Sequence, residues 1–224
     1  MGKDPIMKNN KIRSVCFGDS NTWGYNPENK ERFDDDIRWT GRLQNMLGSR
    51  YQVVECGING RTTVFDEPFR DFRSGKAGIG YSLLENYPLD LLIISLGTND
   101  LKFADHVTLG RAMRQLLRTA KHSGLWNVFN NSVFRGKENI LVISPIPLGA
   151  DLDERFPNSV LYGKYALSLR FAEIYRPICD EYGVEFLDAA QCAAPSEADC
   201  IHMDADSHRA LAEAIYEKVL EILA

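Results

Sequence analysis

Residues 91–100 read LLIISLGTND, and this stretch decides the fold class. The run LLIISL is apolar except for one serine, and it shows no alternation of polar and apolar residues. Such a run is typical of a strand buried on both faces of a parallel sheet. The chain then turns at a glycine into small polar residues. The stretch therefore predicts a buried strand that delivers polar groups to one edge of a sheet.

The same pattern of a strand followed by a helical segment recurs along the chain. Apolar, β-branched runs predict further strands at residues 12–18, 52–56, 140–144 and 184–187, with 91–96 as the third of five. Apolar periodicity predicts helices at 39–47, 107–123, 161–182 and about 204–223. Asp204 is the expected N-cap of the last helix. Segments 57–81 and 124–139, the latter containing Trp126 and Phe129, are expected to be loops.

Alternating strands and helices of this length predict parallel strands joined by right-handed crossovers. We therefore expect an α/β fold with three layers, α/β/α, around a five-stranded parallel sheet. The flavodoxin-like strand order 2-1-3-4-5 would place the switch point in strand order between the first and third strands. No linker, repeat or low-complexity segment divides the chain, so residues 1–224 are expected to form a single domain, with 1–11 as a flexible N-terminus.

Composition excludes several classes of protein. The formal net charge is −5, and no basic stripe is present, which argues against nucleic acid as a partner. No apolar run reaches the roughly 20 residues that span a membrane. The N-terminal stretch MGKDPIMKNNKIRS lacks the apolar segment of a secretory signal. The five cysteines are scattered without a C-x-x-C pair, so we expect reduced thiols in a cytoplasmic protein, with neither a metal nor a cofactor.

Small or polar residues follow every predicted strand. GDSN follows the first, GINGRTT the second, GTND the third, PIPLG the fourth, and DCIH comes after the fifth. In open α/β sheets ligands bind beyond the carboxyl ends of the strands, at the switch point. Ser20 and Asn99 would flank that point. We therefore expect these clusters to converge on one site.

A serine hydroxyl becomes a useful nucleophile only when a base removes its proton and a third group orients that base. Ser20 is the candidate nucleophile. His202 is the candidate base because Asp199 lies three residues before it, a spacing that lets the carboxylate reach the imidazole Nδ1 in a tight turn. The remaining histidines are better explained by helix or loop positions: His106, His122 and His208.

An attacked carbonyl also needs hydrogen-bond donors where negative charge develops, each worth about 3–4 kcal/mol. The backbone N–H groups of Ser20 and Gly60 and the side-chain amide of Asn99 are the candidates for this oxyanion hole. Gly60 has no side chain to hinder the approach of a ligand. Asn21 and Trp23, close to Ser20 in the chain, are candidates for the substrate pocket.

Four blocks of this chain, GDSN, GINGRT, GTND and DCIH, resemble those of the SGNH hydrolases, also called GDSL-type esterases. The resemblance runs from about residue 12 to the C-terminus, and GDSNTWGY, GINGRTTVFDEP and SPIPL are similar to its arylesterase and acyltransferase branch. It implies the same roles for the residues proposed above. It also implies a metal-free, cytoplasmic serine ester hydrolase for small acyl (acetyl or aryl) esters that forms an acyl-enzyme, and a homo-oligomer whose neighbouring subunits narrow the acyl pocket.

Two residues depart from the pattern of the family. Asn21 replaces the leucine that gives the GDSL motif its name, which puts acyl selectivity in question. Cys200 stands where a glycine is usual, so the turn before His202 is expected to differ. Other functions also fit the same residues: a carbohydrate O-acetyl deacetylase, a non-catalytic α/β ligand-binding module, or acyl transfer to an alcohol in a water-poor pocket.

Overall fold

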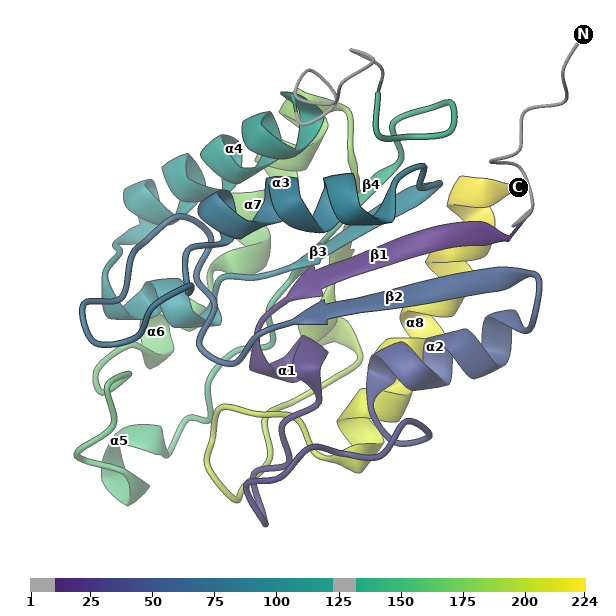
Figure 1. Ribbon diagram of the computed structural model, residues 1–224. Helices are drawn as coiled ribbons and strands as arrows, with labels where there is room; N and C mark the ends of the chain where they lie inside the picture. The colour runs from purple at the N-terminus through teal and green to yellow at the C-terminus, as the bar shows by residue number, and fades with distance from the viewer. Residues whose placement is uncertain (1–10, 123–131) are drawn as a thin grey trace, which may run out of the picture.

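The computed structural model describes residues 11–122 and 132–224, and its centre is a five-stranded parallel sheet (Figure 1). The strands are β1 (Ile12–Gly18), β2 (Tyr51–Gly57), β3 (Leu91–Ser95), β4 (Ile140–Ser144) and β5 (Glu185–Asp188). Their order is β2-β1-β3-β4-β5, and every neighbouring pair is parallel. The predicted fold class and strand order are confirmed, so the switch point lies between β1 and β3.

Helices cover both faces of this sheet, which confirms the three-layer arrangement. The described helices are α1 (Ser20–Trp23), α2 (Trp39–Leu47), α3 (Gly75–Asn86), α4 (His106–His122), α5 (Leu152–Arg155), α6 (Tyr165–Ser168), α7 (Phe171–Tyr182) and α8 (Ala205–Leu223). One face is covered by α3, α4 and α7, and the other by α2 and α8 (Figure 1). The Asp204 side chain caps α8 by accepting a hydrogen bond from Ser207 N, as predicted.

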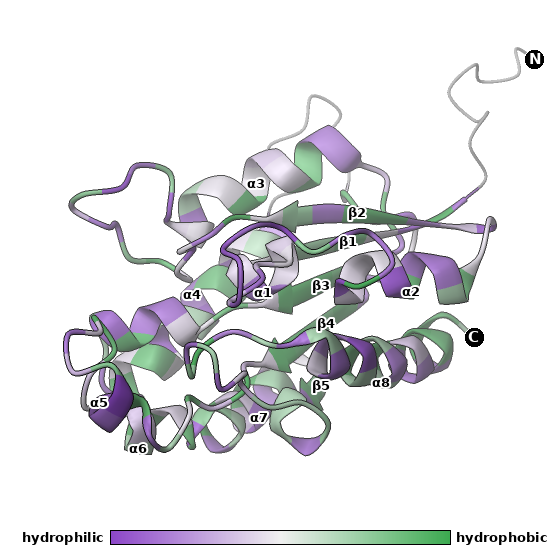
Figure 2. Ribbon diagram, turned by 90° about the horizontal axis from the view of Figure 1, so that it is seen from below, coloured by the Kyte–Doolittle hydropathy of each residue, from purple (hydrophilic) through white to green (hydrophobic). Residues whose placement is uncertain are grey.

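Successive strand residues supply two separate apolar cores. Val15 and Phe17 of β1 pack in the core beneath α3, α4 and α7, whereas Cys16 packs on the α2 and α8 side. In β3, Leu92 and Ile93 face opposite cores in the same way. These two side chains and the three of β1 are fully buried. Figure 2 shows the hydrophobic strands lying between helices with many hydrophilic residues. Burial on both faces explains why the strand sequences show no polar alternation.

The sequence predicts a loop over residues 57–81, but the end of this segment belongs to the helix α3. Three glycines in GKAGIGYSLLEN hid this helix in the sequence, because each glycine costs about 1 kcal/mol of helix stability relative to alanine. Ile79 and Leu83 of α3 are fully buried against the sheet. Tertiary burial therefore outweighs the weak intrinsic propensity of this segment.

The single helix predicted over 161–182 is interrupted. Gly163 has a φ of +73°, a left-handed conformation that does not belong to an α-helix, so the helical part begins only at α6. Leu169 and Arg170 then separate α6 from α7. The Ser168 hydroxyl, at the end of α6, accepts a hydrogen bond from Leu148 N. This hydrogen bond ties the chain after β4 to α6.

Part of the predicted loop 124–139 lies outside the described residues, including Trp126 and Phe129, as do residues 1–10 of the expected N-terminal arm. Within the described part, Val133 and Phe134 pack in the core at 1% and 6% exposure. Val133 O accepts a hydrogen bond from Leu89 N at 3.0 Å. No helix in the described residues combines the length and apolar character needed to cross a bilayer.

Candidate active site

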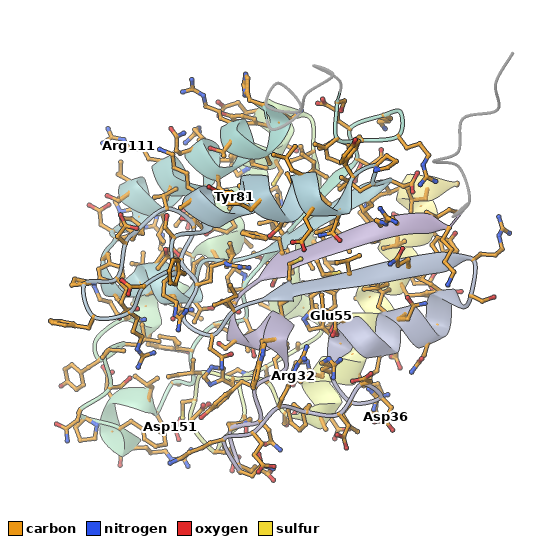
Figure 3. All side chains as sticks on the ribbon, in the orientation of Figure 1. Arg32, Asp36, Glu55, Tyr81, Arg111 and Asp151 are labelled. Atoms are coloured by element: carbon orange, nitrogen blue, oxygen red, sulfur yellow. The ribbon has the colours of Figure 1, made fainter. Side chains whose placement is uncertain are left out.

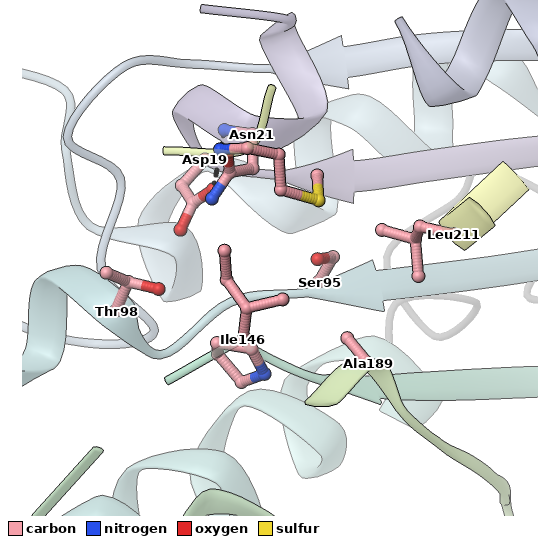
Figure 4. Close-up of a pocket in the computed structure, with 9 residues that line it drawn as sticks. Asp19, Asn21, Ser95, Thr98, Ile146, Ala189 and Leu211 are labelled. Atoms are coloured by element: carbon pink, nitrogen blue, oxygen red, sulfur yellow. Dashed lines mark hydrogen bonds between the residues drawn. The ribbon is translucent and has the colours of Figure 1, made fainter. Parts of the chain in front are cut away.

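A cavity of about 360 Å³ opens at the carboxyl edge of the sheet, where the switch point was expected. Its lining residues are Ser20, Tyr25, Asn59, Gly60, Arg70, Thr98, Asn99, Lys102, Val160, Leu161, Ile201 and His202. A second cavity, between Asp19, Thr98 and Ile146, measures about 10 Å³ and is too small for a substrate (Figure 4). The cavity of about 360 Å³ is the candidate substrate site because Ser20 and His202 both line it, and it contains four of the residues expected from the sequence.

Ser20 is the first residue of α1, directly after β1. The Asp19 carboxylate caps this helix by accepting a hydrogen bond from Asn21 N at 3.0 Å. Ser20 O accepts hydrogen bonds from the N–H groups of Gly24 and Tyr25, both at 2.9 Å. Ser20 is 8% exposed. The end of the strand and the short helix thus hold the hydroxyl in one position at the rim of the cavity.

The structure brings Ser20, His202 and Asp199 together. Ser20 Oγ lies 2.8 Å from His202 Nε2, and His202 Nδ1 lies 2.5 Å from Asp199 Oδ2. Burial alone raises the pKa of Asp199, but the hydrogen bond and the charge of His202 outweigh it, and the net pKa is lowered. An ionised Asp199 accepts a hydrogen bond from Nδ1–H, so the proton stays on Nδ1 and Nε2 has its lone pair toward Ser20.

The turn between Asp199 and His202 forms despite the cysteine at its centre. Asp199 Oδ1 accepts hydrogen bonds from Ile201 N and His202 N, both at 2.9 Å. Cys200 has a φ of +60°, the left-handed region that favours glycine. The cysteine adopts the conformation suited to the usual glycine. The turn before His202 was expected to differ from that of the family because of Cys200, but its backbone conformation is the one that a glycine would adopt.

Two of the three candidate oxyanion donors have no acceptor within the described residues: the Gly60 N–H and the Asn99 side-chain amide. Gly60 has a φ of +81°, so a residue with a side chain there would be strained. The third donor, the Ser20 N–H, lies at the start of α1. All three residues line the cavity beside His202.

A buried carboxylate that the sequence analysis did not single out joins the two loops that carry these donors. Asp100, next to Asn99, accepts hydrogen bonds from the Thr63 N–H at 2.9 Å and from the Thr63 hydroxyl. Burial raises the pKa of Asp100 to about 7. Its position within GTND was visible in the sequence, but its partner in the second loop was not.

Arg61 connects the ends of β1 and β2 beneath the same loops. Its guanidinium donates to Gly18 O at 2.9 Å and to Cys56 O, and it lies 4.0 Å from the centre of the Phe17 ring. Burial lowers the pKa of Arg61 to about 10, which still leaves it charged at neutral pH. Arg61 therefore holds the Gly60 loop, and it does not line the cavity.

Asn21 and Trp23 do not line the candidate substrate cavity, contrary to expectation. Asn21 Oδ1 accepts a hydrogen bond from Met203 N at 3.0 Å and so joins the nucleophile helix to the His202 loop. The Arg32 guanidinium packs 5.4 Å from the Trp23 ring and pairs with Glu55 at 3.0 Å (Figure 3). The aromatic residue that lines the cavity is instead Tyr25, whose ring centre lies 4.4 Å from that of His202.

The other histidines do not join the site. His208 is fully buried in α8, where its Nδ1 accepts a hydrogen bond from Trp39 N at 3.3 Å. His106 begins α4, and His122 ends it with its Nδ1 2.6 Å from Arg118 O. Across residues 11–122 and 132–224, no group of three His, Cys, Asp or Glu side chains is arranged to hold a metal ion.

The chain is similar to a known protein family and to solved structures of esterases. The sequence profile of the GDSL-like lipase/acylhydrolase family matches residues 16–210. The structure of the native M. smegmatis aryl esterase is 31% identical, with a TM-score of 0.86 over 94% of this chain and 99% of that chain. Est24, a carbohydrate acetylesterase from Sinorhizobium meliloti, is 30% identical, with a TM-score of 0.87 over 95% and 100%. No curated protein sequence matches significantly. The chain therefore belongs to the GDSL-like lipase/acylhydrolase family, a family of carboxylic ester hydrolases.

Proposed function

We propose that this protein hydrolyses small acyl esters, acetyl and aryl esters among them, through an acyl-enzyme formed on Ser20. The observation that carries the proposal is the 2.8 Å contact between Ser20 Oγ and His202 Nε2. This is the distance at which a general base takes a proton from a nucleophile. Asp199, on the other side of the ring, stabilises the imidazolium that this transfer creates.

In the first half of the reaction, Ser20 Oγ attacks the ester carbonyl carbon while His202 Nε2 takes the hydroxyl proton. The carbonyl oxygen becomes an oxyanion, stabilised by the N–H groups of Ser20 and Gly60 and by the Asn99 amide. His202 then gives its proton to the departing alcohol oxygen as the tetrahedral carbon collapses. The product is an ester between Ser20 and the acyl group.

In the second half, a water molecule replaces the alcohol. His202 takes a proton from this water as it attacks the acyl carbon, and the same donors stabilise the second oxyanion. Collapse returns the proton from His202 to Ser20 Oγ and releases the acid. The cavity of about 360 Å³ accommodates a small ester, which fits acetyl and aryl substrates.

Hydrolysis of p-nitrophenyl acetate by the wild type and by Ser20→Ala tests this proposal. We expect the variant to lose at least about 10³-fold in kcat, since it lacks the nucleophile, while it retains the fold. Circular dichroism of both proteins provides the control for folding. Full activity in Ser20→Ala would rule out Ser20 as the nucleophile.

Deacetylation of acetylated sugars is a second candidate function. The S. meliloti structure, which is described as a carbohydrate acetylesterase, favours it. The same three residues would perform the chemistry, and only the fit of the alcohol part would differ. Turnover of acetylated xylose compared with phenyl acetate separates the two: a larger kcat/KM for the sugar ester favours the deacetylase, and a larger value for phenyl acetate favours the arylesterase.

Acyl transfer is a proposed side activity of the same acyl-enzyme. The cavity lining includes three apolar side chains, Val160, Leu161 and Ile201, against which an alcohol can pack in place of water. We expect vinyl acetate and benzyl alcohol in buffer to give benzyl acetate in addition to acetic acid. Formation of acetic acid alone would exclude transfer.

We also propose that the protein associates with copies of itself. Near the cavity residues Arg70 and Val160, the chain exposes Phe69 at 93%, Phe72 at 88% and Tyr162 at 57%. Large exposed apolar side chains are a common feature of interfaces. Light scattering measures the assembly directly, and a monomer at micromolar concentration would contradict the proposal.

The proposed location is the cytoplasm. All five cysteines are free thiols in the structure, which suits a reducing compartment. Fractionation of the native host, with detection of the protein in the soluble fraction, tests this location, and recovery outside the cell would contradict it.

A further inference from the structure

The charge of the candidate substrate cavity differs from that of the whole protein. The chain carries a formal net charge of −5, yet the cavity lining contains two cations, Arg70 and Lys102, and no carboxylate. Lys102 Nζ is neutralised by Glu67 Oε2 at 3.0 Å. Arg70 forms no ion pair with any of the residues that the structure describes. The cavity therefore presents one uncompensated guanidinium to whatever enters it.

This guanidinium lies beside the oxyanion donors. A methyl group placed on Gly60 would lie 3.5 Å from Nε of Arg73 and 3.8 Å from Nη1 of Arg70. Of these two residues only Arg70 lines the cavity, and Arg73 donates to Asp71 O. Asp199, the carboxylate of the proposed reaction machinery, is occupied by His202 and by two backbone N–H groups. Nothing in the proposed reaction requires a cation there, because a neutral ester develops only one negative charge and three donors already serve it. Arg70 is thus a cation that the ester hydrolysis mechanism leaves without a role.

We propose that Arg70 selects esters that carry an anionic group, such as a carboxylate, on the acyl or the alcohol part. Its planar guanidinium matches a carboxylate with two parallel hydrogen bonds, and such charge-assisted contacts are stronger than neutral ones. The apolar side chains Val160 and Leu161 remain to pack against the uncharged part of the ester. This inference rests on the proposed esterase function and names the substrate class of the same site.

Two pairs of esters test the inference and show which part of the substrate carries the charge. For the acyl part, ethyl hydrogen fumarate is compared with ethyl crotonate, in which a methyl group replaces the carboxylate. For the alcohol part, 4-acetoxybenzoate is compared with its methyl ester. We measure kcat/KM for all four esters with the wild type, Arg70→Gln and Arg70→Lys. Arg111→Gln removes the same charge from an exposed residue of α4 that does not line the cavity, and it is the matched control (Figure 3).

In at least one pair, we expect Arg70→Gln to lower the ratio of anionic to neutral kcat/KM by about tenfold, the size of one charge-assisted hydrogen bond. Arg70→Lys should retain most of the ratio, and Arg111→Gln all of it. An unchanged ratio in both pairs overturns the inference. Equal losses on anionic and neutral esters also overturn it, because Arg70 then serves the oxyanion of every substrate.

A second readout does not depend on a variant. Raising the salt concentration from about 0.01 M to 0.5 M should lower the wild-type kcat/KM for the preferred anionic ester and leave that for its neutral partner unchanged, because salt screens an exposed charge pair. Equal salt dependence contradicts the inference. Loss of the neutral-ester activity in Ser20→Ala tests the proposed function separately. If that variant keeps full activity, the proposed function fails, and the inference about Arg70 is withdrawn with it.

Discussion

Two histidines near the C-terminus lie in contrasting surroundings. His202, in the loop before α8, contacts a carboxylate through Nδ1 and the Ser20 hydroxyl through Nε2, and its side chain is 17% exposed. His208, in the first turns of α8, is fully buried. Its Nδ1 accepts a hydrogen bond from Trp39 N, and its Nε2 has no hydrogen-bond partner among the residues that the structure describes. Burial lowers the pKa of His208 to about 3, so it is neutral at physiological pH.

The comparison teaches that the surroundings, and not the residue type, make an imidazole a base. A proton carrier needs a carboxylate to stabilise its charged form and a route by which the proton leaves. The loop provides both to His202, whereas the interface between α2 and α8 provides neither to His208. We therefore expect perturbation of the first histidine to change activity and perturbation of the second to change stability.

The largest effect is expected for Asp199→Asn. The asparagine can keep the acceptor for Ile201 N and His202 N, but its NH₂ group would face Nδ1. That contact favours the tautomer with the proton on Nε2, which cannot accept the proton of Ser20. We expect kcat for p-nitrophenyl acetate to fall by about 10³–10⁴-fold with little change in KM.

Thermal unfolding of the same variant provides the control, and we expect a melting temperature close to that of the wild type. Activity within about threefold of the wild type, in a folded variant, would show that His202 does not act through Asp199.

His208→Asn is expected to change the pH dependence of stability and leave activity intact. The free imidazole has a pKa of 6.5 and the buried one a pKa of about 3, so the unfolded chain binds the extra proton between these values. The free energy of unfolding of the wild type therefore falls as the pH drops from 7 to 3, by about 4 kcal/mol from this residue. An asparagine side chain retains an acceptor for Trp39 N and does not titrate.

Urea unfolding at several pH values measures this effect as the difference between the two proteins. Burial raises the pKa of Asp19 to about 6 and that of Asp100 to about 7, so these groups contribute with the opposite sign over the same range. Both proteins share that contribution, and the difference isolates His208. Parallel curves for wild type and variant would show that His208 is not buried in its neutral form.

The smallest of these effects is expected for Asn21→Leu, which introduces the residue usual in the family. Leucine has a similar size but cannot accept the hydrogen bond from Met203 N, so a buried donor beside His202 loses its partner. We expect kcat to fall by about tenfold to the same degree for acetate, butyrate and hexanoate esters, because the loop that carries His202 is less well held. A change in chain-length preference without loss of kcat would instead place Asn21 on the acyl pocket.

The sequence predicted those parts of the site that depend on local chemistry or on sheet topology. Ser20 and Asn99 follow strands whose apolar runs were unmistakable, and the topology of an open α/β sheet brings such ends together. Asp199 and His202 share one tight turn, so their contact follows from their spacing in the chain. No part of this prediction required knowledge of how distant loops fold.

The residues that the sequence did not predict lie on segments without periodicity. Arg70 belongs to a loop in which Glu67 pairs with Lys102 and Arg73 O accepts a hydrogen bond from Thr62 N, and no pattern of apolar residues reports such contacts. Asn21 was expected to contact substrate because it neighbours Ser20, but the direction of its side chain is fixed by Met203. The sequence did not predict α3 because its three glycines are poor helix formers. The helix is stabilised by the burial of Ile79 and Leu83, which the local sequence pattern does not show.

The most direct test of the account is covalent labelling with a fluorophosphonate, followed by mass spectrometry of the digested protein. The reagent reacts with a serine whose hydroxyl proton is removed by a neighbouring base. We predict one adduct per chain, located on Ser20, slowed strongly in Asp199→Asn and unaffected in His208→Asn. A folded wild-type protein that stays unlabelled, or an adduct located on another serine, would contradict the claim that Ser20, His202 and Asp199 act together.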